Sequence, residues 1–369
     1  MKANFIKEIN KKIRNTRPTY SESDICDVFR GGDLLEISFL SKQCVNDLSG
    51  SCIMCDYGCA RQTAPNDKYL ENMRSILNEN SSGVNYLLLG SNGSILNDYQ
   101  ISDSLLTDIL RCAQMCEIPN IIIETHYQDV TEKKLRLISE LMDKPIIIEM
   151  GLETLNSRYH ETIFMKGIDL DKYEETIERI KRYGYEIELN LMFGIPFLSE
   201  FEQFEDTLQS VRWVVNHNCK PIIFPINIKP HTLLRYAYES GFYKPVSLWM
   251  LVQLLDALEP KELCGTIIVW YGNRDESYPG DIPTVFPATC DNCCQILKEF
   301  FQAFADTHDY TERKSLISKL TNKASCDCCR NAKKSIKVPK HDFEEKFASF
   351  CCQLEKEFSG ETNGEVRQK

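Results

Sequence analysis

The sequence predicts an α/β protein whose main part is a partial (β/α)6 barrel of the TIM-like kind, followed by a cysteine-rich C-terminal extension. Apolar runs bounded by turn residues recur through the middle of the chain, and the segments between them carry apolar residues at helical spacing. The runs are continuous in Ile, Leu and Val, which is typical of strands buried on both faces of a parallel sheet. Six such units favour the barrel, and a doubly wound open sheet is the alternative.

Six strands and five helices are expected in this part of the chain. The strands are expected at residues 34–40, 84–90, 120–125, 145–151, 186–194 and 221–228. The helices are expected at residues 66–79, 101–116, 131–142, 169–183 and 201–217. Strands and helices therefore alternate, as a parallel sheet with helical crossovers requires.

Each of the first five strands runs into a polar or glycine-rich segment. These segments are the cysteine loop CVNDLSGSCIMCDYGC (44–59), GSNGSILND (90–98), ETHYQD (124–129), GLET (151–154) and FGIPFLSE (193–200). In a barrel of parallel strands the chemistry lies at the carboxyl ends of the strands. We therefore expect the five segments to converge on one site.

Composition and charge narrow the class of protein. The 369 residues are 43% hydrophobic and 26% charged, which indicates a globular chain with one large domain and an appendage, or with two domains. A formal net charge of −11 argues against a protein that coats nucleic acid non-specifically. Two segments are nevertheless basic, residues 1–17 and RNAKKSIKVPKH (330–341), and each is either a phosphate-binding surface or a solvated face.

The N-terminal sequence and the cysteine content bear on the compartment. MKANFIKEINKKIRN lacks the apolar core of a signal peptide, and the chain has no run of about 18 apolar residues that would span a membrane. We expect a cytoplasmic protein without membrane contact. In that reducing compartment 17 cysteines indicate metal ligation rather than disulfides, with the scattered ones acting as small buried hydrophobes.

The cysteine loop holds four thiols, those of Cys44, Cys52, Cys55 and Cys59. A tetrahedral zinc ion would take all four. A 4Fe-4S cluster with one open iron would take three. Spacing alone leaves both interpretations open, but the position of the loop at the mouth of a barrel favours the cluster, because a structural zinc site has no need to face glycine-rich strand ends.

A second group of cysteines lies near the carboxyl end. Its members are Cys290, Cys293, Cys294, Cys326, Cys328 and Cys329. A C-x2-C pair followed at a distance by another close pair is typical of a metal site. We expect a structural zinc held by Cys290, Cys293, Cys326 and either Cys328 or Cys329, with an auxiliary iron–sulfur cluster as the alternative.

The ordered set of motifs resembles the radical S-adenosylmethionine (SAM) superfamily. The usual cluster spacing there is C-x3-C-x2-C, whereas Cys44, Cys52 and Cys55 follow the longer C-x7-C-x2-C pattern of a subset. GSNGSILN resembles the glycine-rich turn of the family, GLET its ribose-contacting strand end and FGIPFLSE its adenine-side turn. ETHYQD differs from the Glu-Ser-Arg-like strand end of the relatives, so substrate contacts there are expected to differ.

More narrowly, residues 30–330 are similar to the radical-SAM (beta) subunits of archaeosine synthase and to the related elongator catalytic-subunit branch. The segments that carry this similarity are GSCIMCDYG, GSILN, GLETLNSRYHETIFMKG, FGIPFLSE, NIKPHTLL, GFYKPVSLW and TCDNCC. The resemblance implies a basic N-terminal extension at 1–30, a radical SAM barrel at 31–260, a cysteine-rich metal region at 261–358 and a disordered tail at 359–369.

The resemblance also implies the cofactors and their ligands. Cys44, Cys52 and Cys55 would bind the 4Fe-4S cluster as the catalytic cysteines, and the open iron would chelate the methionine part of SAM, so Cys59 is expected not to be a ligand. The further SAM contacts are expected at Met54, Gly90, Ser91, Gly93, Glu124, Glu153, Gly194 and Ile195.

These SAM contacts have different expected roles. The backbone of the glycine turn at 90–93 would reach the methionine amino group, because glycine removes the side-chain obstruction. Glu153 would accept the ribose hydroxyls, with Glu124 or Thr125 as a second polar contact, unless Glu153 only caps a helix. Gly194 and Ile195 would offer a backbone edge to adenine or form only a turn, and Met54 would pack on the adenine face.

The implied activity is reductive cleavage of SAM to a 5′-deoxyadenosyl radical that abstracts a substrate hydrogen, with flavodoxin or ferredoxin as the electron donor. The implied reaction is a lyase step in the 7-deazaguanine modification of tRNA, with a partner transferase subunit. The alternative is a small molecule or a peptide as substrate. Candidates to face the substrate are Tyr57, His126, Asn190, Asn227 and His231.

Overall fold

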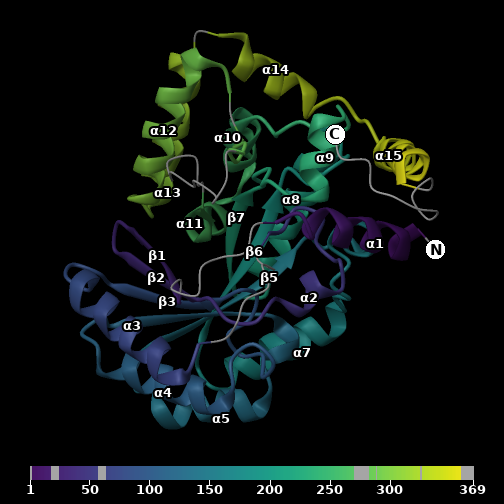
Figure 1. Cartoon of the computed structure of the whole chain (residues 1–369). Coiled ribbons are helices and arrows are strands. Elements are labelled where there is room, and N and C mark those ends of the chain that lie inside the picture. Colours follow the sequence, from purple (N-terminus) through teal and green to yellow (C-terminus); the bar gives the residue numbers. More distant parts are fainter. Residues whose placement is uncertain are drawn as a thin grey trace.

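An eight-stranded sheet that curls into a half-barrel forms the centre of the protein (Figure 1). The computed structural model describes residues 2–17, 25–56, 64–269, 282–287, 289–324 and 326–358. The strands follow one another in chain order: β1 (Cys26–Gly31), β2 (Leu34–Phe39), β3 (Tyr86–Ser91), β4 (Asn120–Thr125), β5 (Ile146–Glu153), β6 (Glu186–Phe193), β7 (Lys220–Pro225) and β8 (Ile267–Ile268). β1 pairs antiparallel with β2, and every later pair is parallel.

Helices connect the parallel strands and cover the convex face of the sheet (Figure 1). They are α3 (Asn66–Asn80), α4 (Asp103–Met115), α5 (Glu132–Leu141), α7 (Leu170–Lys181) and α8 (Glu200–Asn216). α4, α5, α7 and α8 begin at a Ser, Thr or Asp whose side chain accepts a hydrogen bond from a free backbone N–H of the first turn. The predicted α/β half-barrel is confirmed, with its six strands and five helices within a few residues of the expected positions.

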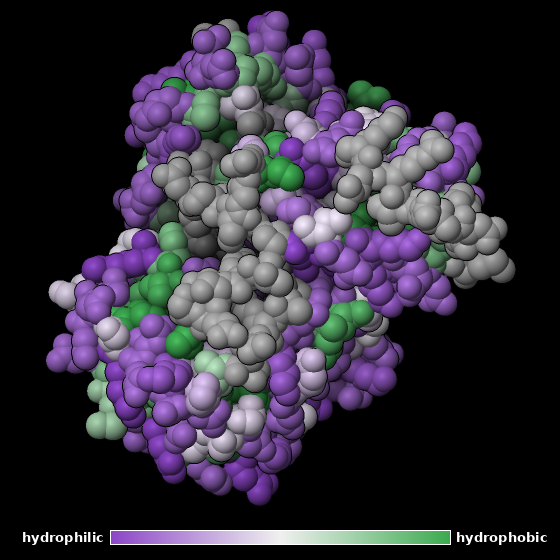
Figure 2. All heavy atoms as spheres, viewed as in Figure 1, coloured by the Kyte–Doolittle hydropathy of each residue, from purple (hydrophilic) through white to green (hydrophobic). Residues whose placement is uncertain are grey.

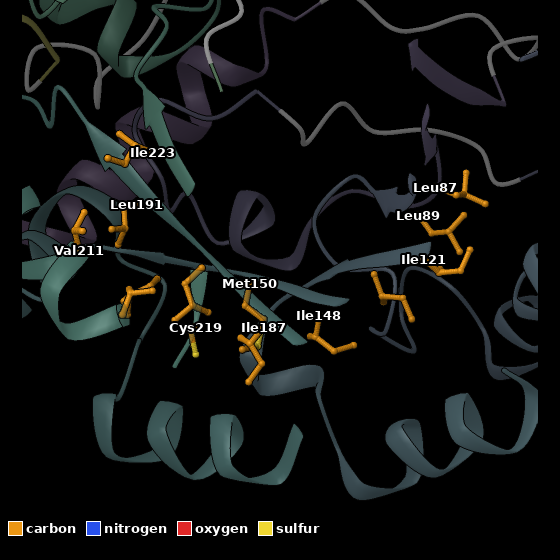
Figure 3. Close-up of a cluster of buried hydrophobic side chains, with 14 of the residues drawn as sticks. Leu87, Leu89, Ile121, Ile148, Met150, Ile187, Leu191, Val211, Cys219 and Ile223 are labelled. Atoms are coloured by element: carbon orange, nitrogen blue, oxygen red, sulfur yellow. The ribbon is translucent and has the colours of Figure 1, made fainter. Parts of the chain in front are cut away.

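The two faces of the sheet carry different side chains. Successive residues of a strand point to opposite faces, so one set packs under the helices and the other faces the inside of the half-barrel. The outer set forms the main core, which includes Ile121, Ile148 and Ile187 (Figure 3). The inner set includes a separate small cluster of Leu88, Ile122 and Ile147. The inside of the half-barrel is therefore built independently of the main core.

The described N-terminal segment is part of the folded structure. α1 (Lys2–Arg14) packs against α9 (Leu233–Glu239) and α15 (Phe343–Phe358) (Figure 1). Ile6 and Ile9 of α1 share a second apolar cluster with residues of the cysteine loop. The sheet begins at β1 and continues to β8, so it extends beyond the expected barrel limits of 31 and 260.

The remaining helices are short elements near the strand ends and a C-terminal group. The short ones are α2 (Val45–Leu48), η1 (Tyr127–Asp129), α6 (Ser157–Tyr159) and the π-helix η2 (His160–Phe164). The C-terminal group comprises α10 (Leu248–Ala257), α11 (Pro260–Gly265), α12 (Asp291–Ala305), α13 (Tyr310–Lys323) and α14 (Asp327–Ser335). Within it α12 packs on α13, α13 on α11, and α10 on α14.

The surface and the helix lengths bear on membrane contact. In the view of Figure 2 the described outer helices present mostly hydrophilic side chains. Among the described helices none has the length and apolar character needed to cross a bilayer. The expected disordered tail at 359–369 lies outside the described residues.

Arg313 joins the C-terminal helices to the end of the barrel. Its side chain on α13 is almost fully buried, and its guanidinium donates to the carbonyl oxygens of Leu263, Cys264 and Thr266, the last at 2.9 Å. These carbonyls belong to α11 and the start of β8. Because a buried carbonyl without a donor is costly, this one side chain stabilises the junction.

Replacing Arg313 by Met should lower the free energy of unfolding by on the order of 3 kcal/mol, because several buried carbonyls lose their donor. Urea unfolding of the purified protein measures this. The control is Arg111→Met on α4, an exposed arginine whose loss should change stability by less than about 0.5 kcal/mol. Equal midpoints for the two variants would contradict the role given to Arg313.

Candidate active site

The cysteine loop follows β2 and buries its thiols. Cys44 lies directly before α2, and the backbone N–H groups of Asn46 and Asp47 hydrogen-bond to its sulfur. Cys44 and Cys52 are buried and Cys55 is half-buried. Burial raises the pKa of all three thiols, that of Cys55 to about 11, and the charges of Cys44 and Cys55 add to the effect at Cys52. The thiols are therefore protonated at neutral pH until a metal displaces the protons.

Two arginines of the N-terminal segment hold the backbone of this loop. Arg14 donates to the carbonyl oxygens of Asp47 at 3.0 Å and Ser51 at 2.6 Å, and also to that of Cys52. Arg17 donates to the carbonyl of Cys55 at 2.9 Å. Both arginines also pair with the buried Asp47 carboxylate, at 2.8 and 3.2 Å. These two cations of the basic segment 1–17 thus support the loop and are not a solvated face.

The other side of the loop is held by the turn after η2. The N–H of Cys52 donates to the carbonyl of Phe164 at 2.7 Å, and the hydroxyl of Ser51 donates to that of Met165 at 2.7 Å. Met165 and Gly167 both have positive φ, so the chain turns sharply around Lys166. π-Helical turns are often found at functional sites, and this one places Lys166 next to the thiols.

Lys166 forms an ion pair with Glu153, and this pair was missed in the sequence. Glu153 ends β5 with a positive φ of 68° and is buried, and one of its carboxylate oxygens has no partner among the described residues. Burial opposes the charge of Lys166, but Glu153, Cys52 and Cys55 together raise its pKa above the usual value. The only sign of this ion pair in the sequence was that Lys166 lies in the motif GLETLNSRYHETIFMKG, thirteen residues after Glu153.

The glycine turn after β3 approaches the cysteine loop closely. A side chain at Gly93 would place its Cβ 2.6 Å from the sulfur of Cys44, and one at Gly90 would come 2.7 Å from a carboxylate oxygen of Glu124. Glycine is therefore required at position 93, whereas at position 90 the end of the Glu124 side chain could move aside. Between them the buried Ser91 hydroxyl has no partner among the described residues. The turn, Cys44 and Glu124 thus lie together, as the sequence predicted for the strand ends.

The strand end ETHYQD brings one of its two expected contacts to the site. Glu124 is half-buried, and burial, with repulsion from Glu36 and Glu153, raises its pKa to about 8. The hydroxyl of Thr125 is instead hydrogen-bonded to that of Ser94 at 2.7 Å, within the turn. Glu124 is therefore the available polar group.

The segment FGIPFLSE forms a tight turn whose backbone is partly occupied. Gly194 has a φ of 98°, and its carbonyl accepts a hydrogen bond from the hydroxyl of Tyr243 at 2.8 Å. The N–H of Ile195 donates to the side chain of Gln203 at 2.5 Å. The Ile195 N–H is therefore already used, whereas the Gly194 carbonyl keeps a second lone pair. Met54 is buried in the second apolar cluster beside Ile53.

The other candidates differ in their surroundings. His126 lies near Lys166, and burial lowers its pKa to about 3, so its imidazole is neutral. Asn190 and Asn227 are buried, and each has a side-chain oxygen without a described partner. The Nδ1 atom of His231 is hydrogen-bonded to the hydroxyl of Thr16 at 2.8 Å. Tyr57 and Cys59 lie outside the described residues.

The second cysteine group forms a compact set of thiols. The sulfur atoms of Cys290, Cys293, Cys326 and Cys328 all lie within 4.8 Å of one another. Cys290 directly precedes α12 and Cys326 directly precedes α14, so two helix N-termini face the set. Hydrogen bonds, the strongest from Cys293, lower the pKa of Cys326 to about 7. Cys329 is not a member of the set, so the structure places Cys328 at the fourth position.

The two thiol sets differ in spacing. Among the described residues the loop thiols of Cys44, Cys52 and Cys55 do not form a group within 4.8 Å, whereas the C-terminal four do. A single zinc ion with Zn–S bonds of about 2.3 Å holds its sulfurs about 3.8 Å apart. In a 4Fe-4S cluster each thiolate binds a different iron, which separates the sulfurs further. The C-terminal set therefore has the spacing of one ion, and the loop thiols are spread more widely.

The central part of the chain is similar to a known protein family. The sequence profile of the Radical SAM superfamily matches residues 40–211, which run from the end of β2 into α8. Residues 40–211, just under half of the chain, are therefore similar to radical SAM proteins. The matched segment contains the cysteine loop, the glycine turn, Glu153 and Lys166, and this similarity indicates that the protein is an enzyme.

Curated proteins similar to this chain include the beta subunit of archaeosine synthase from two organisms. The beta subunit of Methanosarcina acetivorans is 25% identical over 60% of the chain, and that of Thermococcus kodakarensis is 24% identical over 56%. The chain spans 65% of the length of each. An uncharacterized protein of Methanocaldococcus jannaschii is 22% identical over 84% of the chain and 85% of its own length.

Solved structures similar to this chain are more distant in sequence than these curated proteins. A queuine lyase from Clostridium spiroforme, bound to SAM and queuine, is 21% identical with a TM-score of 0.40, over 54% of this chain and 78% of its own. Methylornithine synthase is 14% identical with a TM-score of 0.46, over 85% and 91%.

Replacing Arg14 by Met should lower the iron content of the anaerobically reconstituted protein at least severalfold, because the loop carbonyls lose a buried donor and the thiols lose their fixed positions. Iron analysis per chain measures the effect. Lys12→Met, an exposed residue of the same helix, is the matched control. Full iron content in the Arg14 variant would show that the loop holds its shape without this clamp.

Proposed function

We propose that Cys44, Cys52 and Cys55 hold a 4Fe-4S cluster whose open iron binds SAM. The observation that carries the proposal is the meeting of two buried thiols and one half-buried thiol with a turn whose glycine at position 93 lies against the sulfur of Cys44. When bound, the reduced cluster supplies the electron that cleaves SAM and so provides a 5′-deoxyadenosyl radical, the electron coming from a flavodoxin or ferredoxin.

The surrounding residues have roles that follow from their contacts. The free carboxylate oxygen of Glu153 accepts ribose hydroxyls, while Lys166 forms an ion pair with the other oxygen. The backbone of Gly90, Ser91 and Gly93 receives the methionine amino group. Glu124 supplies the second polar contact.

The apolar side of the proposed SAM site comes from two other segments. Met54 is buried between two of the cluster cysteines and contributes a hydrophobic contact to adenine. The remaining lone pair of the Gly194 carbonyl accepts from the adenine amino group, since the Ile195 N–H already donates to Gln203.

We further propose that the reaction is a lyase step in tRNA modification. A carbon–nitrogen bond of a lysine-type side chain on a 7-deazaguanine base breaks, and an amidine remains. The archaeosine synthase subunits among the relatives support this reaction and a partner transferase subunit. The basic segment 330–341 supports contact with tRNA, because Lys333, Lys334 and Lys337 are exposed and have no ion pair among the described residues. The net charge of −11 favours the second candidate, a small molecule or peptide substrate.

We propose a structural zinc at Cys290, Cys293, Cys326 and Cys328. The compact set of four sulfurs supports one tetrahedral ion rather than an auxiliary cluster. Burial raises the pKa of Cys293, and the N–H of the buried Trp249, which has no hydrogen-bond acceptor among the described residues, lies near enough to oppose that rise. A zinc-bound thiolate would accept a hydrogen bond from this N–H. The ion would tie α12 to α14 and fix the start of the basic segment.

Reconstituted protein with SAM and dithionite should yield 5′-deoxyadenosine, because the three loop thiols hold the cluster. Cys55→Ala should abolish the product, and Cys352→Ala, which removes an exposed thiol of α15, should not. Chromatographic detection of 5′-deoxyadenosine measures this. Absence of the product from the unaltered enzyme would overturn the proposal of a radical activity.

The substrate is tested by mass spectrometry of tRNA and metabolites from cells with and without the gene. We expect loss of an amidine-bearing 7-deazaguanosine from tRNA when the gene is deleted. A change confined to metabolites or peptides would reject the tRNA reaction and support the second candidate.

Metal analysis of anaerobically purified protein should find about four irons and one zinc per chain, as expected for one cluster and one tetrahedral ion. Cys328→Ser should lose the zinc and keep the iron. Cys329→Ser is the matched control, since Cys329 is next to Cys328 in the chain but its thiol lies outside the compact set. About eight irons, or zinc loss in the Cys329 variant alone, would contradict the assignment.

A further inference from the structure

Three glutamates lie side by side on the inner face of the half-barrel. Glu124 of β4 is in register with Glu149 of β5, which is in register with Glu188 of β6. The residues that precede them, Ile123, Ile148 and Ile187, pack into the outer core, so the glutamates point inward. We call Glu124, Glu149 and Glu188 the acidic row.

Without a bound ligand, the burial of the acidic row raises the free energy of the folded protein. Glu149 and Glu188 are about 95% buried, and like charges on neighbouring strands repel. Burial raises the pKa of Glu188 to about 7, and burial with repulsion from its neighbours raises that of Glu149 well above its ordinary range. Among the described residues no Lys, Arg or His nitrogen lies within 4.0 Å of these three carboxylates. The two lysines that act on them, Lys166 and Lys220, are paired with Glu153 and Glu186.

Asn190 extends the row with a further acceptor. Its side chain is 9% exposed, and it follows Glu188 by two residues on β6, so both lie on the same face of the sheet. Its amide nitrogen donates to a carboxylate oxygen of Glu149 at 2.8 Å, and its side-chain oxygen has no hydrogen-bond partner among the described residues. The Asn190 oxygen and the ionised carboxylates of the row are hydrogen-bond acceptors, and a positively charged ligand rich in donors favours that ionised state.

The row lies next to the proposed SAM site. A carboxylate oxygen of Glu124 comes within 2.7 Å of a Cβ built on Gly90 of the glycine turn. Asn190 is in register with Gly151, two residues before Glu153. A group bound on the row therefore lies on the same inner face as the residues that would hold SAM.

The geometry distinguishes between two kinds of cation. Carboxylates also bind divalent metal ions, but an ion needs several ligand atoms around one point. The only group of three or more Cys, His, Asp or Glu ligand atoms that converges within 4.8 Å, among the described residues, is the C-terminal cysteine set. The acidic row is spread along the sheet, so an organic ammonium would donate to neighbouring members such as Glu149 and Asn190 without contacting all of them at one point.

We propose that the acidic row, together with Asn190, binds a positively charged amine of the substrate. The inference rests on the proposed function, because it makes this amine the ammonium group of the lysine-type side chain on the modified base. Bound ammonium supplies the missing donors and the missing positive charge. The row then acts as a specificity element that holds the side chain on the inner face.

The test uses reconstituted holoenzyme with SAM and two probes of equal length, 1,5-diaminopentane and the neutral 1,5-pentanediol, in calorimetric titrations. The diamine should bind and the diol should bind at least about tenfold more weakly, since hydrogen bonds to charged groups are the stronger ones. Glu149→Gln and, separately, Glu188→Gln should weaken diamine binding about tenfold or more. Glu186→Gln, an exposed residue of the same strand paired with Lys220, is the matched control.

The outcomes separate this inference from the proposed function. Equal binding of diamine and diol, or unchanged diamine binding in both variants, would overturn the acidic row while 5′-deoxyadenosine formation by the unaltered enzyme still stood. Failure of the unaltered enzyme to form 5′-deoxyadenosine would overturn the proposed function whatever the titrations show. Far-ultraviolet circular dichroism matched to the control variant shows that Glu149→Gln and Glu188→Gln are folded; if one is not, the other carries the test.

Discussion

The hydrogen bonds from Arg14 to the cysteine loop are the contact on which the rest of the site depends. In the described part of the loop, residues 44–56, the only helix is the short α2, so backbone groups outside it need other partners. Arg14 supplies donors on one side and the turn after η2 supplies acceptors on the other. The positions of Cys44, Cys52 and Cys55 are thus set by segments more than a hundred residues apart in the chain.

The architecture of the barrel could be predicted because burial on both faces leaves a plain signal. Runs such as those that became β4 and β5 are almost unbroken Ile, and the helices between them keep their apolar spacing. β1 escaped prediction because it is an edge strand with mostly exposed or half-buried residues, so tertiary pairing rather than sequence pattern defines it. The packing of α1 could not be foreseen either. Its arginine Arg14 contacts the loop, whereas a basic segment in a sequence is equally compatible with a solvated face.

The strand ends that form the candidate site were easier to predict than the charged contacts around them. Glu153 stands in a quoted motif, but its partner Lys166 depends on a π-helix and two positive-φ residues that no local pattern announces. Glu149 and Glu188 were visible as single charges inside apolar runs. Their alignment depends on the register of β5 and β6, which a sequence of one chain does not contain.

The packing of α1 on α15 links the two ends of the described chain. α1 is synthesised before residues 343–358, so its apolar face lacks part of its partner until those residues have been made. The arginine clamp on the cysteine loop is therefore completed late in synthesis. The loop thiols thus reach fixed positions only after α15 has folded against α1.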